Sequence, residues 1–141
     1  MRICAFILAG LSAATLAAEL PRPGYVLIVH PSSRAARVDR KFLADVFLRR
    51  ATRWPDDRPI YPVDLGPTAP ARVRFSQEIL SRSVASVRSY WQQRIFSGQG
   101  LPPPEFPDEH GVVSYVATHP GAIGYVSLGT PMNGAAILEV N

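Results

Sequence analysis

Residues 60–80 read IYPVDLGPTAPARVRFSQEIL and join three patterns within one short stretch. The apolar start predicts a buried strand, the Gly- and Pro-rich middle predicts a turn, and the remainder predicts a helix. Pro70 suits the first turn of that helix, because a proline at this position loses no hydrogen bond. A helix start beside a strand end directs free backbone N–H groups toward one point, where anions commonly bind. The plainer alternative is a loop that only connects the strand to the helix.

The residues before this stretch predict a strand and a helix. Tyr25–Val29, YVLIV, is a continuous apolar run rich in β-branched residues, as in a strand buried on both faces. Asp39 is placed to cap the helix that follows, because its carboxylate can accept from the first free N–H groups. The loop over Thr52–Pro59 carries Trp54, which we expect to cover the edge of the core.

The residues after it predict two more helices and two more strands. Ser83 is placed to cap a helix whose apolar side chains recur at steps of three and four residues, at Val84, Val87, Trp91 and Ile95. A helix is expected over Glu109–Thr118, followed by strands over Ala122–Ser127 and Ala135–Val140. Strands that alternate with helices predict an α/β fold, in which a small sheet is flanked by helices.

The composition is that of one domain. The 141 residues include 14 arginines and one lysine against 11 acids, for a net charge of +4, and the two signs are interspersed along the chain. A small positive excess suits anionic partners only weakly. Because no cluster of basic residues with interleaved aromatics stands out, we expect no nucleic acid partner.

The N-terminus has the pattern of a secretory signal peptide. A basic residue precedes an apolar run from Ile3 to Leu11, and small residues follow at the positions that a signal peptidase reads. We therefore expect cleavage after Ala17, which gives a signal peptide over residues 1–17 and a periplasmic domain over residues 18–141. The alternative is an uncleaved anchor, although the apolar run is short for a membrane span. Cys4 is the only cysteine, so the processed chain would contain no disulfide.

The usual motifs for catalysis, metal binding and cofactor binding are missing from the sequence. The three histidines, His30, His110 and His119, are widely spaced and form no HxxxH or HExxH pair, so we expect no metal site. The GxSxG, Walker A and GxGxxG patterns are missing as well. We therefore expect neither an enzyme nor a bound cofactor.

Several segments together resemble the phosphate-binding components of bacterial ABC importers, which have the type II periplasmic solute-binding fold. The matching segments span almost all of residues 18–141 and include YVLIVHPSS, FLADVFLRRATRWPDDRPIYPVD, SYWQQRIFSGQGLPP and VVSYVATHPGAIGYVS. Full members of this family have two lobes that close on the ligand. This chain is long enough for only one lobe, so the resemblance implies a single-lobe periplasmic-binding-protein-like domain with half a binding cleft.

The resemblance also implies where a ligand would bind. In the family, the helix start that corresponds to Ala69–Pro70–Ala71 carries Ser-Gly-Thr, whose hydroxyls and backbone N–H groups hold phosphate. This chain has alanine at both hydroxyl positions, and the family's upstream arginine falls near Leu65 and is missing. What remains of the ligand-binding site is expected at Thr68, Ala69, Ala71 and Arg72. A hydrogen bond to a charged ligand contributes about 1.5–3 kcal/mol, so these losses predict much weaker phosphate binding.

Two functions follow from these patterns. The first is an exported solute-binding-like protein that binds a small, phosphate-like oxyanion without catalysis, as the phosphate-binding component of an ABC transporter does. The second is an envelope interaction or sensory module that has lost solute binding and docks onto an envelope protein or onto itself. Measurable anion affinity would favour the first function, and a persistent dimer or a protein partner would favour the second.

Overall fold

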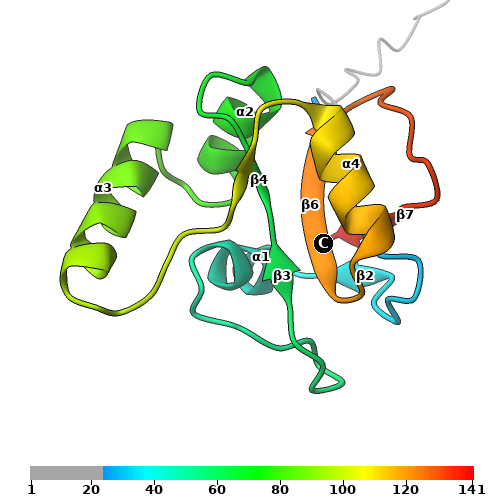
Figure 1. Ribbon diagram of the computed structural model, residues 1–141, viewed down its shortest axis with the longest axis horizontal. Coiled ribbons are helices and arrows are strands. Elements are labelled where there is room, and N and C mark those ends of the chain that lie inside the picture. Colours follow the sequence, from blue (N-terminus) through cyan, green and yellow to red (C-terminus); the bar gives the residue numbers. More distant parts are fainter. Residues whose placement is uncertain (1–23) are drawn as a thin grey trace, which may run out of the picture.

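The computed structural model describes residues 24–141, so the predicted signal peptide over residues 1–17 and the first residues of the predicted domain lie outside the described part. Within the described part, seven short strands form two sheets, and four helices flank them (Figure 1). None of the helices described over these residues is long and apolar enough to span a membrane. The predicted α/β fold with a small sheet is confirmed.

The larger sheet has the strand order β2-β7-β1-β6-β3. Its centre is β1 (Tyr25–Val29), which pairs antiparallel with both β6 (Ala122–Ser127) and β7 (Ala136–Val140). At the edges, β2 (Arg37–Val38) runs parallel to β7, and β3 (Tyr61–Pro62) runs parallel to β6. The first and last strands are therefore neighbours in the middle of the sheet.

The smaller sheet contains β4 (Asp64–Leu65) and β5 (Glu105–Phe106), which run parallel. The sequence predicted one strand at the start of residues 60–80, whereas the structure divides that run between the two sheets. The backbone N–H of Val63 still donates to a carbonyl of β6 at 2.9 Å, while the next N–H, that of Asp64, donates to the residue before β5 at 2.8 Å. The chain therefore passes from one sheet to the other between two successive residues.

The helices begin where the sequence predicts. Asp39 caps α1 (Arg40–Phe47) by accepting from the N–H of Phe42 at 2.6 Å, and Ser83 caps α3 (Val84–Phe96) by accepting from the N–H of Ser86 at 3.1 Å. Pro70 opens α2 (Pro70–Glu78), and Asp108 caps α4 (Glu109–Thr118). These caps satisfy N–H groups that a helix start otherwise leaves unpaired.

Helices cover both faces of the larger sheet, and successive residues of β6 show this alternation. Gly124 faces α4 so closely that an added Cβ would lie 2.8 Å from Cγ1 of Val112. Tyr125, the next residue, stacks on Phe75 of α2 with ring centroids 4.0 Å apart and lies 5.8 Å from Phe47 of α1. The core therefore has an aliphatic layer under α4 and an aromatic layer under α1 and α2.

The third helix, α3, lies to one side of this body (Figure 1). Val87 and Trp91 are buried and attach it, as predicted. Ile95, which the sequence placed on the same inward face, is instead 47% exposed, and Phe96 is 90% exposed. The prediction for Ile95 was wrong because the last turn of α3 extends past the body, where no described element covers it. Trp54 is buried at the core edge as expected, and its ring N–H donates to the carbonyl of Gly121 at 3.3 Å.

Candidate functional site

The predicted site begins where residues 66–69 turn the chain from β4 into α2. Two backbone bonds hold this turn: the N–H of Gly66 donates to Phe106 O at 3.0 Å, and the N–H of Ala69 donates to Gly66 O at 3.1 Å. Ala69 is the N-cap residue of α2 and has extended backbone angles, φ −62° and ψ 131°. Because alanine has no side-chain acceptor, the start of α2 has no side-chain cap.

This helix start offers free amides to a ligand. The first backbone bond across it joins the N–H of Val73 to Ala69 O at 3.1 Å, and the N–H groups of Ala71 and Arg72 have no acceptor within residues 24–141. The hydroxyl of Thr68 lies just before them on an exposed residue. Free N–H groups and the positive end of the helix dipole favour an anion at this position.

The side chain of Arg72 points away from the start of α2 and into the protein, where it is buried. Its Nη1 donates to Leu65 O at 2.7 Å and to Glu105 Oε1 at 3.2 Å, and it lies 3.5 Å from Asp64 Oδ1. Its Nε is also buried and has no partner in the described part of the chain. The structure therefore places the amide of Arg72 at the helix start and its guanidinium behind it, against two carboxylates.

Helical spacing could have identified this burial. Arg72 precedes Phe75 by three residues and Ile79 by seven, and both of these side chains are buried. Positions with this spacing share one face of a helix, so Arg72 belongs to the inward face. The prediction assigned the Arg72 side chain to a ligand instead, because of its charge.

Asp64 is a buried carboxylate that the sequence analysis did not single out. It accepts a hydrogen bond from the hydroxyl of Tyr125 and pairs with Arg72. Burial raises the pKa of the Asp64 carboxyl to about 6, although the Arg72 guanidinium and the Tyr125 hydroxyl act in the opposite direction. The available signal was an acid inside the otherwise apolar run from Ile60 to Leu65.

Beside this ion pair lies a cleft of about 420 Å³ between α3 and the segment over residues 102–105. Arg72 is among its lining residues, whereas Thr68, Ala69 and Ala71 are not. The structure thus separates the predicted site into a helix start with three of the residues and an internal ion pair with the fourth side chain.

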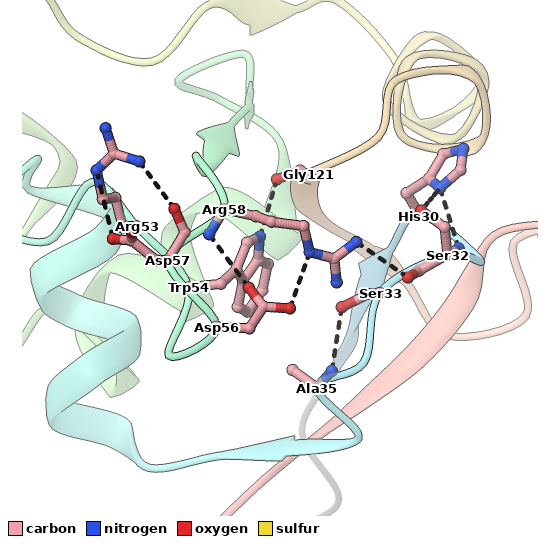
Figure 2. Close-up of polar contacts among 10 residues, drawn as sticks. All are labelled: His30, Ser32, Ser33, Ala35, Arg53, Trp54, Asp56, Asp57, Arg58 and Gly121. Carbon is pink, nitrogen blue, oxygen red and sulfur yellow. Dashed lines mark hydrogen bonds and ion pairs between the residues drawn. The ribbon is translucent and has the colours of Figure 1, made fainter.

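A second polar region joins the loop over Thr52–Pro59 to the end of β1 (Figure 2). Arg58 donates to Asp56 Oδ2 at 2.8 Å and to Ser32 O at 3.4 Å. The Nδ1 of His30 accepts from the N–H of Ser32 at 3.0 Å and lies 2.7 Å from the Oγ of the same residue.

The contact between His30 and Ser32 stabilises the turn after β1 and does not form a catalytic pair. The backbone N–H and the Oγ of Ser32 both contact Nδ1 of His30. A nucleophilic triad would also need a carboxylate on the second ring nitrogen, and no carboxylate of the described residues bonds to it. The same part of the chain contains no group of three potential metal ligands. This region therefore fixes the loop in place.

Comparison with known proteins supports one conclusion about the fold. No family model matches the chain, and no curated protein matches it. Solved structures do match it, four of them at 12–20% identity. The chain has the fold of one lobe of phosphate ABC transporter substrate-binding proteins. The predicted resemblance is confirmed at the level of the fold, since identities this low carry no further conclusion.

Three of these structures show how much of each protein is shared. A substrate-binding protein from Clostridium perfringens with bound phosphate has a TM-score of 0.62 and 20% identity, over 83% of this chain and 44% of its own. PstS from Borrelia burgdorferi has a TM-score of 0.64 and 14% identity, over 84% and 47%. A phosphate transport receptor from Vibrio cholerae has a TM-score of 0.61 and 16% identity, and the match covers 83% of this chain and 46% of the receptor. This chain therefore spans less than half the length of the proteins it matches.

Proposed function

We propose that this protein is a solute-binding-like lobe that holds a small oxyanion, phosphate or a similar ion, at the start of α2 and does not catalyse a reaction. The observation that supports it is the uncapped start of α2, where the amides of Ala71 and Arg72 have no acceptor in residues 24–141. The same fold carries phosphate in the Clostridium perfringens protein. Free amides at a helix start are a general anion site.

Each predicted residue has a distinct role in this proposal. Thr68 supplies a hydroxyl, Ala69 leaves room at the cap position, and Ala71 and Arg72 supply amides. The guanidinium of Arg72 does not bond to the ligand, because its Nη1 already donates to Leu65 and Glu105. It contributes only its charge, from behind the helix. With one lobe and one hydroxyl, the affinity should be much lower than that of a closed two-lobed site.

The test is calorimetric titration of the purified protein, dialysed free of phosphate, with phosphate and then with sulfate. The decisive variant is Ala69→Asp, which places a carboxylate at the N-cap to accept from the same amides and repel the anion. We expect this variant to lose the binding heat and to gain about 1 kcal/mol of stability, as a cap typically provides.

The matched control is Gln77→Glu, which changes the net charge equally at an exposed position near the other end of α2. Binding that survives in Ala69→Asp, or that is lost equally in the control, would exclude the helix start as the site.

Export is part of the same proposal, and it requires a mature N-terminus at Ala18 or one residue later in the periplasmic fraction. An intact Met1 in that fraction would contradict cleavage.

A second candidate function is self-association through the tip of α3. Ile95, Phe96 and Leu101 are all exposed there, at 47%, 90% and 72%. Three large apolar side chains that are exposed within seven residues of one another favour an interaction surface. Sedimentation velocity should then show a dimer that the double variant Phe96→Ser/Leu101→Ser converts to monomer. A wild-type monomer at all concentrations would reject this candidate.

A further inference from the structure

Three arginines that are far apart in the sequence gather around one aromatic ring. The guanidinium carbons of Arg82, Arg94 and Arg50 lie 5.2, 5.3 and 5.9 Å from the ring centroid of Tyr90. They come from the turn before α3, the last turn of α3 and the turn after α1. The sequence alone does not show this cluster, because the three arginines meet only in the folded chain.

The ring is a fixed platform for this cluster. Tyr90 is partly buried, and its hydroxyl donates to Leu48 O at 2.8 Å, which holds the ring between α1 and α3. Arg94 lies 5.9 Å from the ring of Trp91 as well. Cations are attracted to aromatic faces at these distances, so the rings hold the guanidinium groups together.

The cluster has little compensating negative charge. Within residues 24–141 no ion pair involves Arg82 or Arg94. Arg50 has only Asp45, at 3.9 Å, and Asp45 lies closer to Lys41, at 2.7 Å. The sequence from residue 79 to residue 104 contains no acid at all. Like charges around one ring repel one another, and a bound anion would offset that repulsion.

The helix ends explain only part of this arrangement. Arg94 lies in the last turn of α3, where positive charge is favoured, and Arg50 follows the last residue of α1 by three residues. Arg82 directly precedes Ser83, the N-cap of α3, where positive charge is disfavoured, and the first turn of α3 contains no acid. The attraction to Tyr90 therefore holds Arg82 where the helix dipole disfavours it, and a bound anion would offset the charge of the cluster.

We infer that Arg50, Arg82 and Arg94 form a binding site for a multivalent phosphate group on the α1–α3 side of the protein, separate from the start of α2. Guanidinium groups match the geometry and the charge of phosphate oxygens. A free oligophosphate and an anionic lipid headgroup present the same chemistry to this site, and the experiment separates the two sources.

The test measures binding of two probes at low salt to the purified protein. Tripolyphosphate is titrated by calorimetry, and vesicles of equimolar phosphatidylglycerol and phosphatidylcholine are tested by co-sedimentation, with pure phosphatidylcholine vesicles as the neutral comparison. We expect at least one probe to bind, with an affinity that falls as salt is added. The variant Arg82→Gln/Arg94→Gln should weaken that binding on the order of tenfold or more, because it removes charge-assisted contacts.

The matched control is Arg37→Gln/Arg53→Gln, which removes the same charge from exposed arginines that pair with Glu139 and Asp57. Binding of tripolyphosphate alone would identify free phosphate as the source, and binding of vesicles alone would identify the headgroup. If neither probe binds, or if the control loses as much affinity as the variant, the site is refuted. The single variant Arg82→Gln serves if the double variant does not fold. All comparisons are made in the Ala69→Asp background, so that anion binding at the start of α2 does not contribute.

Discussion

At the scale of single residues, the burial of charge determines most of the chemistry of this lobe. Arg72 and Asp64 are nearly inaccessible, and each depends on the other and on Glu105, Leu65 and Tyr125 for its polar contacts. Removing one partner of such a pair leaves a buried charge unmatched. For this reason the variant Arg72→Ala would test stability rather than anion binding.

The Asp64 carboxyl makes stability depend on pH in a predictable direction. Its pKa is about 6 in the folded protein against an ordinary value of 3.8, so its protonated form favours folding. Its contribution to stability is complete below pH 3.8 and is lost as the pH rises through about 6. The loss should be on the order of 3 kcal/mol, since each unit between the two pKa values corresponds to about 1.4 kcal/mol.

Urea unfolding across this pH window measures the effect. We expect Asp64→Asn to flatten the pH dependence relative to the unchanged protein, because asparagine still accepts from Tyr125 but does not titrate. Asp57→Asn is the control, since Asp57 is exposed and its left-handed φ of 70° suits asparagine. Parallel curves for the Asp64 variant and the unchanged protein would contradict the assignment.

At the scale of the elements, close packing of β6 under α4 depends on a missing side chain. A Cβ on Gly124 would lie 2.8 Å from Val112 Cγ1, 3.1 Å from Val63 Cγ2 and 3.3 Å from Val116 Cγ2. All three neighbours are buried valines, which cannot move aside without disturbing both β6 and α4.

We therefore expect Gly124→Ala to destabilise the protein by about 1–3 kcal/mol, the usual cost of overpacking a core. Gly66→Ala is the matched control, since its Cβ would lie 3.9 Å from the nearest atom, Phe106 O. Thermal unfolding of the two variants gives the comparison. Equal melting temperatures would mean that α4 can shift away from β6 without cost.

Local sequence signals were sufficient for most elements. Asp39, Pro70 and Ser83 were identified as helix starts because capping depends on a few neighbouring residues. The division of residues 60–65 between two sheets was not predictable, since both partners, β6 and β5, are distant in the sequence. The exposure of Ile95 was also not predictable. Helical spacing gives the face of the helix on which a side chain lies, but it does not show how far along that face other elements cover the helix.

The proposed binding sites also contain one part that was predictable from the sequence and one that was not. The uncapped helix start at Ala69 was predictable from the residues around it, although ligand binding there stays a prediction. The gathering of Arg50, Arg82 and Arg94 at Tyr90 was not predictable, because it requires the relative placement of α1 and α3. Within the sequence, 11 or more residues separate each of these arginines from the next.

At the scale of the whole molecule, stability should be uneven. The strands β1 and β6 are buried through their centres and have partners on both sides, whereas α3 is attached mainly by Val87 and Trp91. Segments with few buried contacts open locally before the protein unfolds. We expect amide hydrogen exchange in α3 to be faster than in β1 and β6, which should exchange only by global unfolding. Equal protection in the two regions would show that α3 is an integral part of the core.

The position of β1 between β6 and β7 also has a consequence for biosynthesis. A ribosome makes residues 25–29 well before residues 122–140, so the central strand lacks both of its neighbouring strands until those later residues have been made. Pairings between such distant segments form slowly, because a long loop must close first. We expect the larger sheet to stay unformed until residues 122–140 have left the ribosome.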